Sequence, residues 1–228
     1  MTNFIKLFKT YDNAKTNLKK NIVSKTFHYK NLIIELHPEV YEPAEDTFQL
    51  LESIEVKSGD NVLEIGTGCA IIALKCANLG ANVVCTDINP YAVALAKRNY
   101  NKNKSLIKGV FEVRKGDLFS TVKNNEKFDV IIFNPPYLPT KKNELVGGSG
   151  WFDIATDGGV DGLSLTKRFI NGLSKHLSNC GKAYFVFSSL SNRKKIEMYL
   201  SKQRLMSKII SSYCFDDETI FVYRIFKY

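Results

Sequence analysis

The 228-residue chain lacks the features that mark several large classes of protein, above all long apolar runs. No stretch approaches the roughly 18 consecutive apolar residues that indicate a membrane span. The amino terminus shows no extended apolar region followed by small residues, so we expect no secretory signal. Internal repeats and low-complexity linkers are also missing. These absences favour a cytoplasmic protein that does not engage a membrane.

The cysteines and histidines show none of the groupings that bind metals or form a disulfide framework. The five cysteines are dispersed, odd in number and without a C-x-x-C spacing, which indicates free thiols in a reducing compartment. His28, His37 and His176 are isolated from one another and from the cysteines. We therefore expect no metal site, and no histidine or cysteine that serves as a catalytic base.

Charge is the clearest compositional bias. The formal net charge is +9 and the isoelectric point is near 9.2. Such a balance can attract nucleic acid. Lysine is abundant throughout the chain, however, with local enrichment only in residues 6–30 and 193–208. Nucleic acid is therefore a possible partner that the composition does not favour.

The hydrophobic pattern predicts an α/β fold. Strand and helix patterns alternate, which is typical of a doubly wound, mostly parallel sheet with helices on both faces. We expect seven strands in this sheet and a C-terminal antiparallel pair, because the connection at residues 214–218 is short. The seven expected strands are residues 61–65, 82–86, 110–114, 128–133, 182–187, 206–213 and 219–226, and a further strand is expected ahead of them at 32–36. The expected helices are 44–54, 70–79, 90–101, 161–177 and 192–202.

Two segments stand apart from this alternation. Residues 1–35 are expected to form a basic extension and a first strand, ahead of the main domain in residues 36–228. Apolar residues between Phe4 and Tyr11 have partly helical spacing, and a short packed helix or a frayed end is favoured over a membrane-surface helix. Residues 134–160 are rich in Gly, Pro and Lys. This connection is too long to be passive, so we expect it to be functional.

The segment Glu64-Ile65-Gly66-Thr67-Gly68 closes the strand pattern at residues 61–65. In an open parallel sheet, ligands bind beyond the carboxyl ends of the strands. Gly66 and Gly68 permit a tight turn and a close approach of a ligand to the backbone. Asp87 ends the next strand, where a carboxylate can accept hydrogen bonds from both hydroxyls of a ribose. The segment and Asp87 together predict a nucleoside pocket.

Asp117 and Leu118 follow the third strand of this series. Asp117 is placed to bind an adenine amino group, and Leu118 to cover the ring. A dinucleotide is disfavoured because Ile71 stands where the diphosphate-binding pattern needs a third glycine. An acid at Glu64 would repel phosphate but suits an ammonium group. These features favour S-adenosylmethionine; the alternative is that Glu64 and Asp87 are merely polar strand ends.

Asn134-Pro135-Pro136-Tyr137 follows the fourth strand, which is expected beside the first and therefore near the cofactor. The side-chain oxygen of Asn134 and the carbonyl of Pro135 are two acceptors held by a stiff turn. Together they can hold both hydrogens of a planar NH2 group, while Tyr137 packs against it. This pattern predicts methyl transfer to a neutral nitrogen, with Asn134, Pro135 and Tyr137 as catalytic residues and Pro136 as a further substrate contact. Alone, it is equally typical of a proline turn.

These motifs resemble those of the HemK/PrmC-like class I methyltransferases, which methylate the side-chain amide of a glutamine in translation termination factors. The resemblance runs from about Leu36 to the carboxyl terminus, and its small archaeal and eukaryotic branch matches best. The matching segments are Val40-Tyr41-Glu42-Pro43-Ala44-Glu45-Asp46-Thr47, Cys85-Thr86-Asp87-Ile88-Asn89-Pro90, Phe133-Asn134-Pro135-Pro136-Tyr137 and Gly158-Gly159-Val160-Asp161-Gly162. The N-P-P-Y motif is shared with nucleic-acid methyltransferases, whereas the first octet is more specific.

The resemblance implies a set of cofactor contacts. These are Thr47, Glu64, Gly66, Asp87, Asp117, Leu118 and Asn134, the last also touching the glutamine. Ala70 replaces a glycine that is common in this loop, and we expect it to be tolerated if the backbone torsions there are ordinary. Glu45 and Asp46 are expected to complement the positive end of the helix at residues 44–54.

Relatives of this branch work with a small activator protein that pairs with a sheet edge. The corresponding edge here is the strand from Val110 to Arg114, and exposure of Val110, Phe111 and Val113 would invite strand addition. We therefore expect a heterodimer.

Several functions remain in competition. The leading one is methylation of the glutamine in the Gly-Gly-Gln motif of a class-1 release factor. The clamp would also suit an exocyclic amine of DNA or RNA, adenine N6 or guanine N2, although the chain has no added domain for a flipped base. Protein lysine suits a neutral clamp less well. A non-catalytic binding subunit is disfavoured because Glu64, Asp87 and Asn134 are all present.

Overall fold

The computed structural model describes residues 25–137, 151, 158, 162–215 and 217–228. The apolar segment expected between Phe4 and Tyr11 lies outside these residues, as does most of the predicted functional connection at 134–160. Within the described part of the chain, no helix is both long and apolar enough to cross a bilayer.

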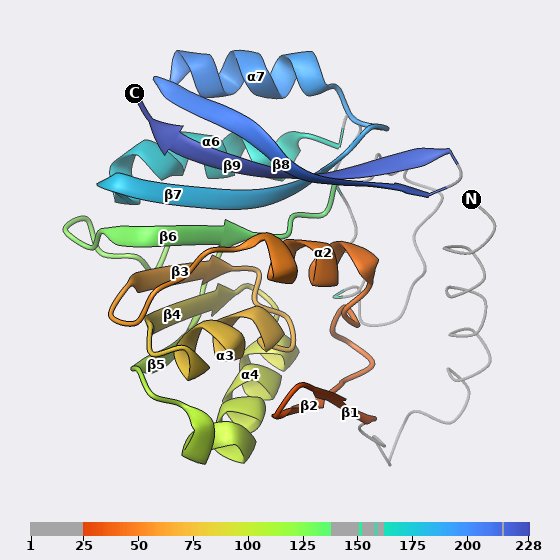
Figure 1. Cartoon of the computed structure of the whole chain (residues 1–228), viewed down its shortest axis with the longest axis vertical. Coiled ribbons are helices and arrows are strands. Elements are labelled where there is room, and N and C mark those ends of the chain that lie inside the picture. Colours follow the sequence, from red (N-terminus) through yellow and green to blue (C-terminus); the bar gives the residue numbers. More distant parts are fainter. Residues whose placement is uncertain (1–24, 138–150, 152–157, 159–161, 216) are drawn as a thin grey trace.

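The described residues form one seven-stranded sheet in the spatial order β5-β4-β3-β6-β7-β9-β8 (Figure 1). Strands β3 to β7 are parallel to one another, and β9 runs antiparallel between β7 and β8. The predicted sheet, with its antiparallel pair at the carboxyl terminus, is confirmed. The strands are β3 (Asn61–Ile65), β4 (Asn82–Asp87), β5 (Phe111–Lys115), β6 (Phe128–Phe133), β7 (Leu177–Ser188), β8 (Leu205–Phe215) and β9 (Glu218–Lys227).

Helices cover both faces of this sheet (Figure 1). One buried cluster joins the sheet to α2, α3 and α4, and a second joins it to α6 and α7. Alternate strand residues supply the two clusters: Val62 and Val130 belong to the first, Leu63 and Ile131 to the second. The helices are α2 (Glu45–Ser53), α3 (Ile71–Asn78), α4 (Pro90–Asn103), α6 (Ser164–His176) and α7 (Arg193–Lys202), with a short 3-10 turn, η2 (Lys104–Leu106), after α4.

The strand order reverses direction at β3 and β6, and this reversal opens a crevice. The chain runs outward from β3 through β4 to β5, then returns to place β6 on the other side of β3. At such a switch in strand order, the loops at the carboxyl ends diverge and leave a crevice.

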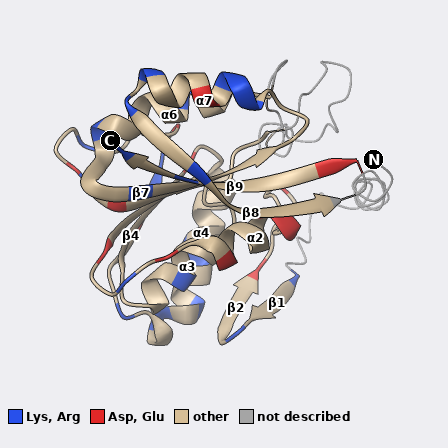
Figure 2. Ribbon diagram, turned by 45° about the horizontal axis from the view of Figure 1, so that its top comes forward, with Lys and Arg blue, Asp and Glu red and all other residues tan. Residues whose placement is uncertain are grey.

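The described lysines and arginines occur on helices of both faces, among them α4 and α7, so the positive charge is not confined to one layer (Figure 2).

Strand β7 is longer than predicted. It begins at Leu177, directly after α6, rather than at Lys182. Its first residues, including Asn179 and Gly181, are polar or small and do not alternate with apolar ones, so their pattern does not predict a strand.

An additional strand, β1 (Thr26–Tyr29), pairs antiparallel with β2 (Leu32–Glu35) and was missed by the sequence analysis. Lys30 in the turn has φ 52°, a conformation for which glycine or asparagine is the usual signal. Leu32 and Ile34 are buried in the same cluster as α3 and α4. The proposed domain boundary at Leu36 stays a prediction.

Two asparagines on α4 hold this hairpin in place. Asn99 accepts from the Glu35 N–H (2.8 Å) and donates to the Glu35 carbonyl (3.0 Å). Asn103 makes the same pair of bonds with Ile33 (2.8 and 2.7 Å). Four residues of a helix rise about 6 Å, close to the roughly 6.6 Å between alternate residues of a strand. The two side-chain amides therefore bond to the backbone along the edge of β2, as a neighbouring strand would.

Strand β5 lies at the end of the sheet, as predicted, with β4 as its neighbour. The Val110 carbonyl accepts from the Val83 N–H and the Gly116 N–H donates to the Asp87 carbonyl, both toward β4. Because backbone groups alternate along a strand, those of Phe111, Val113 and Lys115 face away from β4.

The predicted exposure of the β5 side chains is only partly correct. Val110 is 64% exposed, whereas Phe111 and Val113 are half-buried against the core. Phe111 stacks on Tyr100 with ring centroids 4.8 Å apart. Helix α4 supplies this partner, which the strand pattern alone does not reveal.

Replacing Asn99 with alanine should destabilise the fold. The Asn99→Ala variant leaves the backbone groups of Glu35 and the Cys69 carbonyl without their side-chain partner. Unsatisfied buried groups cost about 1–3 kcal/mol each, so we expect a loss of roughly 3 kcal/mol in unfolding free energy. Urea denaturation measures it. Asn101→Ala, at an exposed position of the same helix, is the control and should change stability by less than about 0.5 kcal/mol. Equal stability of the two variants would contradict the role of Asn99.

Candidate active site

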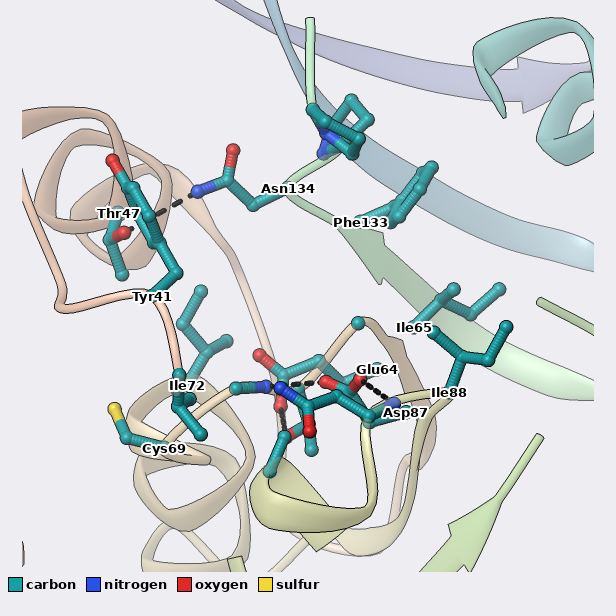
Figure 3. A pocket seen from close by; sticks show the side chains of 18 of the residues that line it. Tyr41, Thr47, Glu64, Ile65, Cys69, Ile72, Asp87, Ile88, Phe133 and Asn134 are labelled. Atoms are coloured by element: carbon teal, nitrogen blue, oxygen red, sulfur yellow. Dashed lines mark hydrogen bonds between the residues drawn. The ribbon is translucent and has the colours of Figure 1, made fainter. Parts of the chain in front are cut away.

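A single pocket lies at the carboxyl ends of β3, β4, β5 and β6, closed on one side by α2 (Figure 3). Every residue that the sequence singled out lines it: Thr47, Glu64, Gly66, Gly68, Asp87, Asp117, Leu118, Asn134, Pro135, Pro136 and Tyr137. These residues are brought together from five separate elements. Of the long connection at 134–160, Trp151 also lines the pocket.

The floor of the pocket is the turn between β3 and α3. Gly66 has φ 66° and Gly68 has φ 54°, the left-handed region that favours glycine. The Thr67 N–H donates to the Thr86 carbonyl at 3.0 Å and fastens the turn to β4. The turn thereby presents its backbone to the pocket.

Ala70 departs from expectation. Its φ is 65° and its ψ is 23°, so the torsions are left-handed rather than ordinary. A non-glycine residue there carries local strain on the order of 1 kcal/mol. Its fully buried methyl group belongs to the core around α3, which offsets part of that cost.

Glu64 is a buried carboxyl group at the base of the pocket, with only 4% of its surface exposed. It accepts hydrogen bonds from the Thr67 hydroxyl (2.5 Å) and from the Ala73 N–H (3.2 Å). Burial raises the pKa of Glu64 to about 8, against the opposing effect of these two bonds. A cationic group next to it would favour the ionised form.

Asp87 ends β4 and is held by backbone groups. Its carboxylate accepts from the Gly68 N–H and the Asn89 N–H, each at 2.9 Å. Burial raises the pKa of Asp87. The two bonds use one lone pair on each oxygen, so each oxygen retains a second acceptor site.

Asp117 and Leu118 form the rim beyond β5. The Asp117 carboxylate pairs with Arg168 of α6 at 2.6 Å, and its side chain is 40% exposed. Leu118 is buried, with φ 49°. This ion pair could not be predicted from local sequence, because Arg168 lies more than fifty positions away, on a helix that covers the sheet.

Asn134 directly follows β6, and its amide has a defined orientation (Figure 3). Its Nδ2 donates to Asp46 Oδ2 at 3.1 Å and to Thr47 Oγ1 at 3.4 Å. Its Oδ1 is buried and has no hydrogen-bond partner in the described structure. An orphaned buried acceptor on a pocket wall indicates a missing donor.

Asp46 is the site residue that the sequence analysis assigned differently. It lies in the first turn of α2, as expected for a residue that complements the helix dipole, but it is 6% exposed and faces the pocket. Its carboxylate also accepts from the hydroxyl groups of Tyr41 and Tyr137 at 3.2 Å. The sequence held a signal for this position, since Asp46 precedes the buried Leu50 by four residues and shares its face of the helix.

The lining suits a nucleoside that carries an ammonium group better than a nucleotide. Among the described lining residues there is no Lys, Arg or His, and three carboxylates stand at strand ends. Phosphate would meet no counter-charge here, whereas hydroxyl, amino and ammonium donors would find acceptors.

Comparison with known proteins places these features in a family. A model of the methyltransferase small domain matches residues 42–148. A relative from Methanocaldococcus jannaschii, provisionally named a protein N5-glutamine methyltransferase, is 47% identical over 164 residues, which cover 71% of this chain and 79% of that protein. The human methyltransferase HEMK2 is 32% identical over 198 residues, covering 83% of this chain and 90% of that protein.

A solved structure has the same fold. The E. cuniculi Mtq2–Trm112 complex, described as responsible for methylation of the eRF1 termination factor, aligns with a TM-score of 0.61 and 22% identity. The alignment covers 83% of this chain and 99% of that one. At this identity the likeness concerns the fold alone. The two sequence relatives carry the assignment further: the chain belongs to the HemK-like protein N5-glutamine methyltransferases of class I.

Proposed function

We propose that this chain transfers a methyl group from S-adenosylmethionine to the side-chain amide of the glutamine in the Gly-Gly-Gln motif of a class-1 release factor. The observation that carries the proposal is the buried, unpartnered Oδ1 of Asn134 on the pocket wall. A glutamine amide offers the donor that this oxygen lacks. The names of the relatives, one of them acting on a termination factor, support the same substrate class.

The cofactor carries the donors that the acceptors of the pocket need. Glu64 would hold the ammonium group, Asp87 the ribose hydroxyls, and Asp117 with Leu118 the adenine. Gly66 and Gly68 would let the ligand lie against the backbone, and Thr47 would contact it from α2. S-adenosylmethionine supplies an electrophilic methyl group on a sulfonium when bound.

The remaining work of the chain is positioning. Asn134 Oδ1 and the Pro135 carbonyl would accept the two amide hydrogens, which orients the nitrogen and increases its electron density. Pro136 stiffens the turn, and the buried ring of Tyr137 packs beside it. Transfer disperses the positive charge of the sulfonium, so a dry site of fixed geometry contributes more than a strong base.

The direct experiment is an assay with methyl-labelled S-adenosylmethionine. Release factor, tRNA, rRNA and DNA are offered in parallel, with and without a Trm112 protein. We expect label on the release factor, at the glutamine, and none on a factor whose motif glutamine is replaced by alanine. Label on a nucleic acid alone would overturn the proposed substrate in favour of an exocyclic base amine.

Two substitutions should separate transfer from cofactor binding. Asn134→Ala removes an acceptor that acts mainly on the transition state, so kcat should fall at least about a hundredfold with cofactor affinity nearly unchanged. Asp87→Ala removes the ribose acceptor, so cofactor affinity should weaken first. Calorimetric titration and single-turnover transfer measure the two effects. An Asn134→Ala variant that loses binding and transfer equally would contradict the assigned role, as would unchanged affinity in Asp87→Ala.

Cofactor binding should depend on pH through Glu64. Since burial raises the pKa of Glu64 to about 8, its carboxyl group is protonated at pH 6 in the free protein. An ammonium ligand binds better to the ionised form, so binding should release a proton and affinity should rise from pH 6 to 7.5, by up to about tenfold per unit. Glu64→Gln should bind more weakly and without this slope. A wild-type affinity that is flat across this range would contradict the contact.

We also propose that a small activator protein adds a strand to β5. The outward backbone groups of Phe111, Val113 and Lys115, together with the 64% exposed Val110, support this edge as the interface. Val110→Asp should weaken binding of a Trm112 protein at least about tenfold, or 1.4 kcal/mol. Met198→Asp, on the exposed side of α7, is the matched control. Size-exclusion chromatography and titration measure the complex; a chain that is monodisperse and fully active alone would rule out an obligatory partner.

A further inference from the structure

We infer that Asp46 is a positioning residue that fixes the orientation of the Asn134 amide, so that its oxygen rather than its NH2 group faces the amino group to be methylated. The inference rests on the proposed function, because it concerns how the acceptor of that site is aimed. Neither residue type nor spacing in the sequence assigned this role to Asp46.

Asp46 is a buried charge without a counter-charge among the described residues. It is 6% exposed, and no described Lys, Arg or His forms an ion pair with it. Its carboxylate is instead satisfied by donors from Tyr41, Thr47, Asn134 and Tyr137. A buried carboxylate of this kind is costly to fold compared with an apolar side chain. The fold therefore keeps it at a site where its acceptor character is used.

The two oxygens of Asp46 have separate tasks. Oδ1 accepts from the backbone N–H and the hydroxyl of Thr47, at 2.6 and 3.1 Å, and from the Tyr41 hydroxyl at 3.2 Å. Oδ2 accepts from Asn134 Nδ2 at 3.1 Å and from the Tyr137 hydroxyl at 3.2 Å. The first oxygen ties Asp46 to its own helix, and the second reaches across the pocket to the end of β6.

The orientation of Asn134 follows from this division. An amide has one donor end and one acceptor end, whereas a carboxylate only accepts. Facing Asp46 Oδ2, Asn134 must present its NH2 group, and its Oδ1 is then directed away from Asp46. A hydrogen bond to a charged acceptor also polarises the amide, which strengthens Oδ1 as an acceptor.

The hydroxyl groups of Tyr41 and Tyr137 donate hydrogen bonds to Asp46. Burial and the nearby Asp46 charge raise the pKa of Tyr41 and of Tyr137 well above the ordinary value. Both phenols stay protonated at neutral pH and can only donate to this carboxylate. The arrangement leaves Asn134 no stable alternative in which its oxygen faces Asp46.

Asp46→Asn provides a sharp test because the backbone N–H of Thr47 cannot turn. The new amide keeps its oxygen on the Thr47 side and places its NH2 group toward Asn134. Asn134 must then reverse, with its oxygen toward position 46 and its NH2 group toward the substrate. The NH2 group of Asn134 would then face the NH2 group of the substrate, which needs an acceptor at that position.

We expect Asp46→Asn to lower kcat at least about a hundredfold, comparable with the loss of one preorganised polar group, while cofactor affinity changes less than about threefold. The double variant Asp46→Asn/Asn134→Asp restores the pairing. Its amide at position 46 donates to a carboxylate at position 134, whose other oxygen again faces the pocket, and total charge is unchanged. This variant should be at least about tenfold more active than Asp46→Asn alone.

Controls separate positioning from stability. Glu45→Gln removes one negative charge from the exposed neighbouring position of α2 and should leave kcat unchanged. Thermal unfolding checks that every variant is folded. The inference is overturned if Asp46→Asn keeps kcat within about threefold of wild type, or if the double variant is no more active than either single one. If the wild-type chain labels another planar NH2 group and not the release factor, the proposed substrate fails, and the Asp46 series measured on that other substrate still decides the inference.

Discussion

A carboxylate on α2 and an amide at the end of β6 face each other across 3.1 Å, and the chemistry of the pocket depends on that contact. The carboxylate lies in the first turn of its helix, and the amide follows the last residue of a buried strand. Neither side chain could be aimed without the other, since each fills the polar needs of its partner in a place with little water. The parallel sheet supplies the rigid frame, and the contact between α2 and β6 supplies the direction.

The pocket handles charge in a consistent way. Its described lining contains carboxyl groups but no basic side chain, and burial holds the pKa values of Glu64 and Asp87 above their ordinary values. Burial disfavours the ionised form of these carboxyl groups, and a positively charged ligand beside them favours it. The same property discriminates against phosphate-bearing ligands. The family assignment and the electrostatics of the wall therefore agree with each other without either depending on the other.

The sequence was sufficient where local pattern and tertiary structure point the same way. Apolar strands, glycines at a left-handed turn and polar residues at strand ends predicted the sheet, its order at the β5 edge and the residues that line the pocket. It was insufficient where a side chain's role depends on a distant partner. From the sequence, Asp46 was expected to complement a helix dipole. The structure shows that it also accepts a hydrogen bond from Asn134, which follows β6. Phe111 was expected to be exposed, but it stacks on Tyr100. The turn at Lys30 was not predicted, because a positive φ is unusual for lysine.

One amide links two regions that are far apart in the chain. Asn99 binds Glu35 of the amino-terminal hairpin and, with the same Nδ2, the carbonyl of Cys69 next to the cofactor turn at 2.9 Å. The hairpin and the turn between β3 and α3 therefore share one polar partner on α4, in addition to the apolar contacts of Leu32 and Ile34 with the same core. A register of β2 along α4 that differed by one residue would leave both the hairpin and this turn without their amide partner, so the position of α4 is specified from two sides.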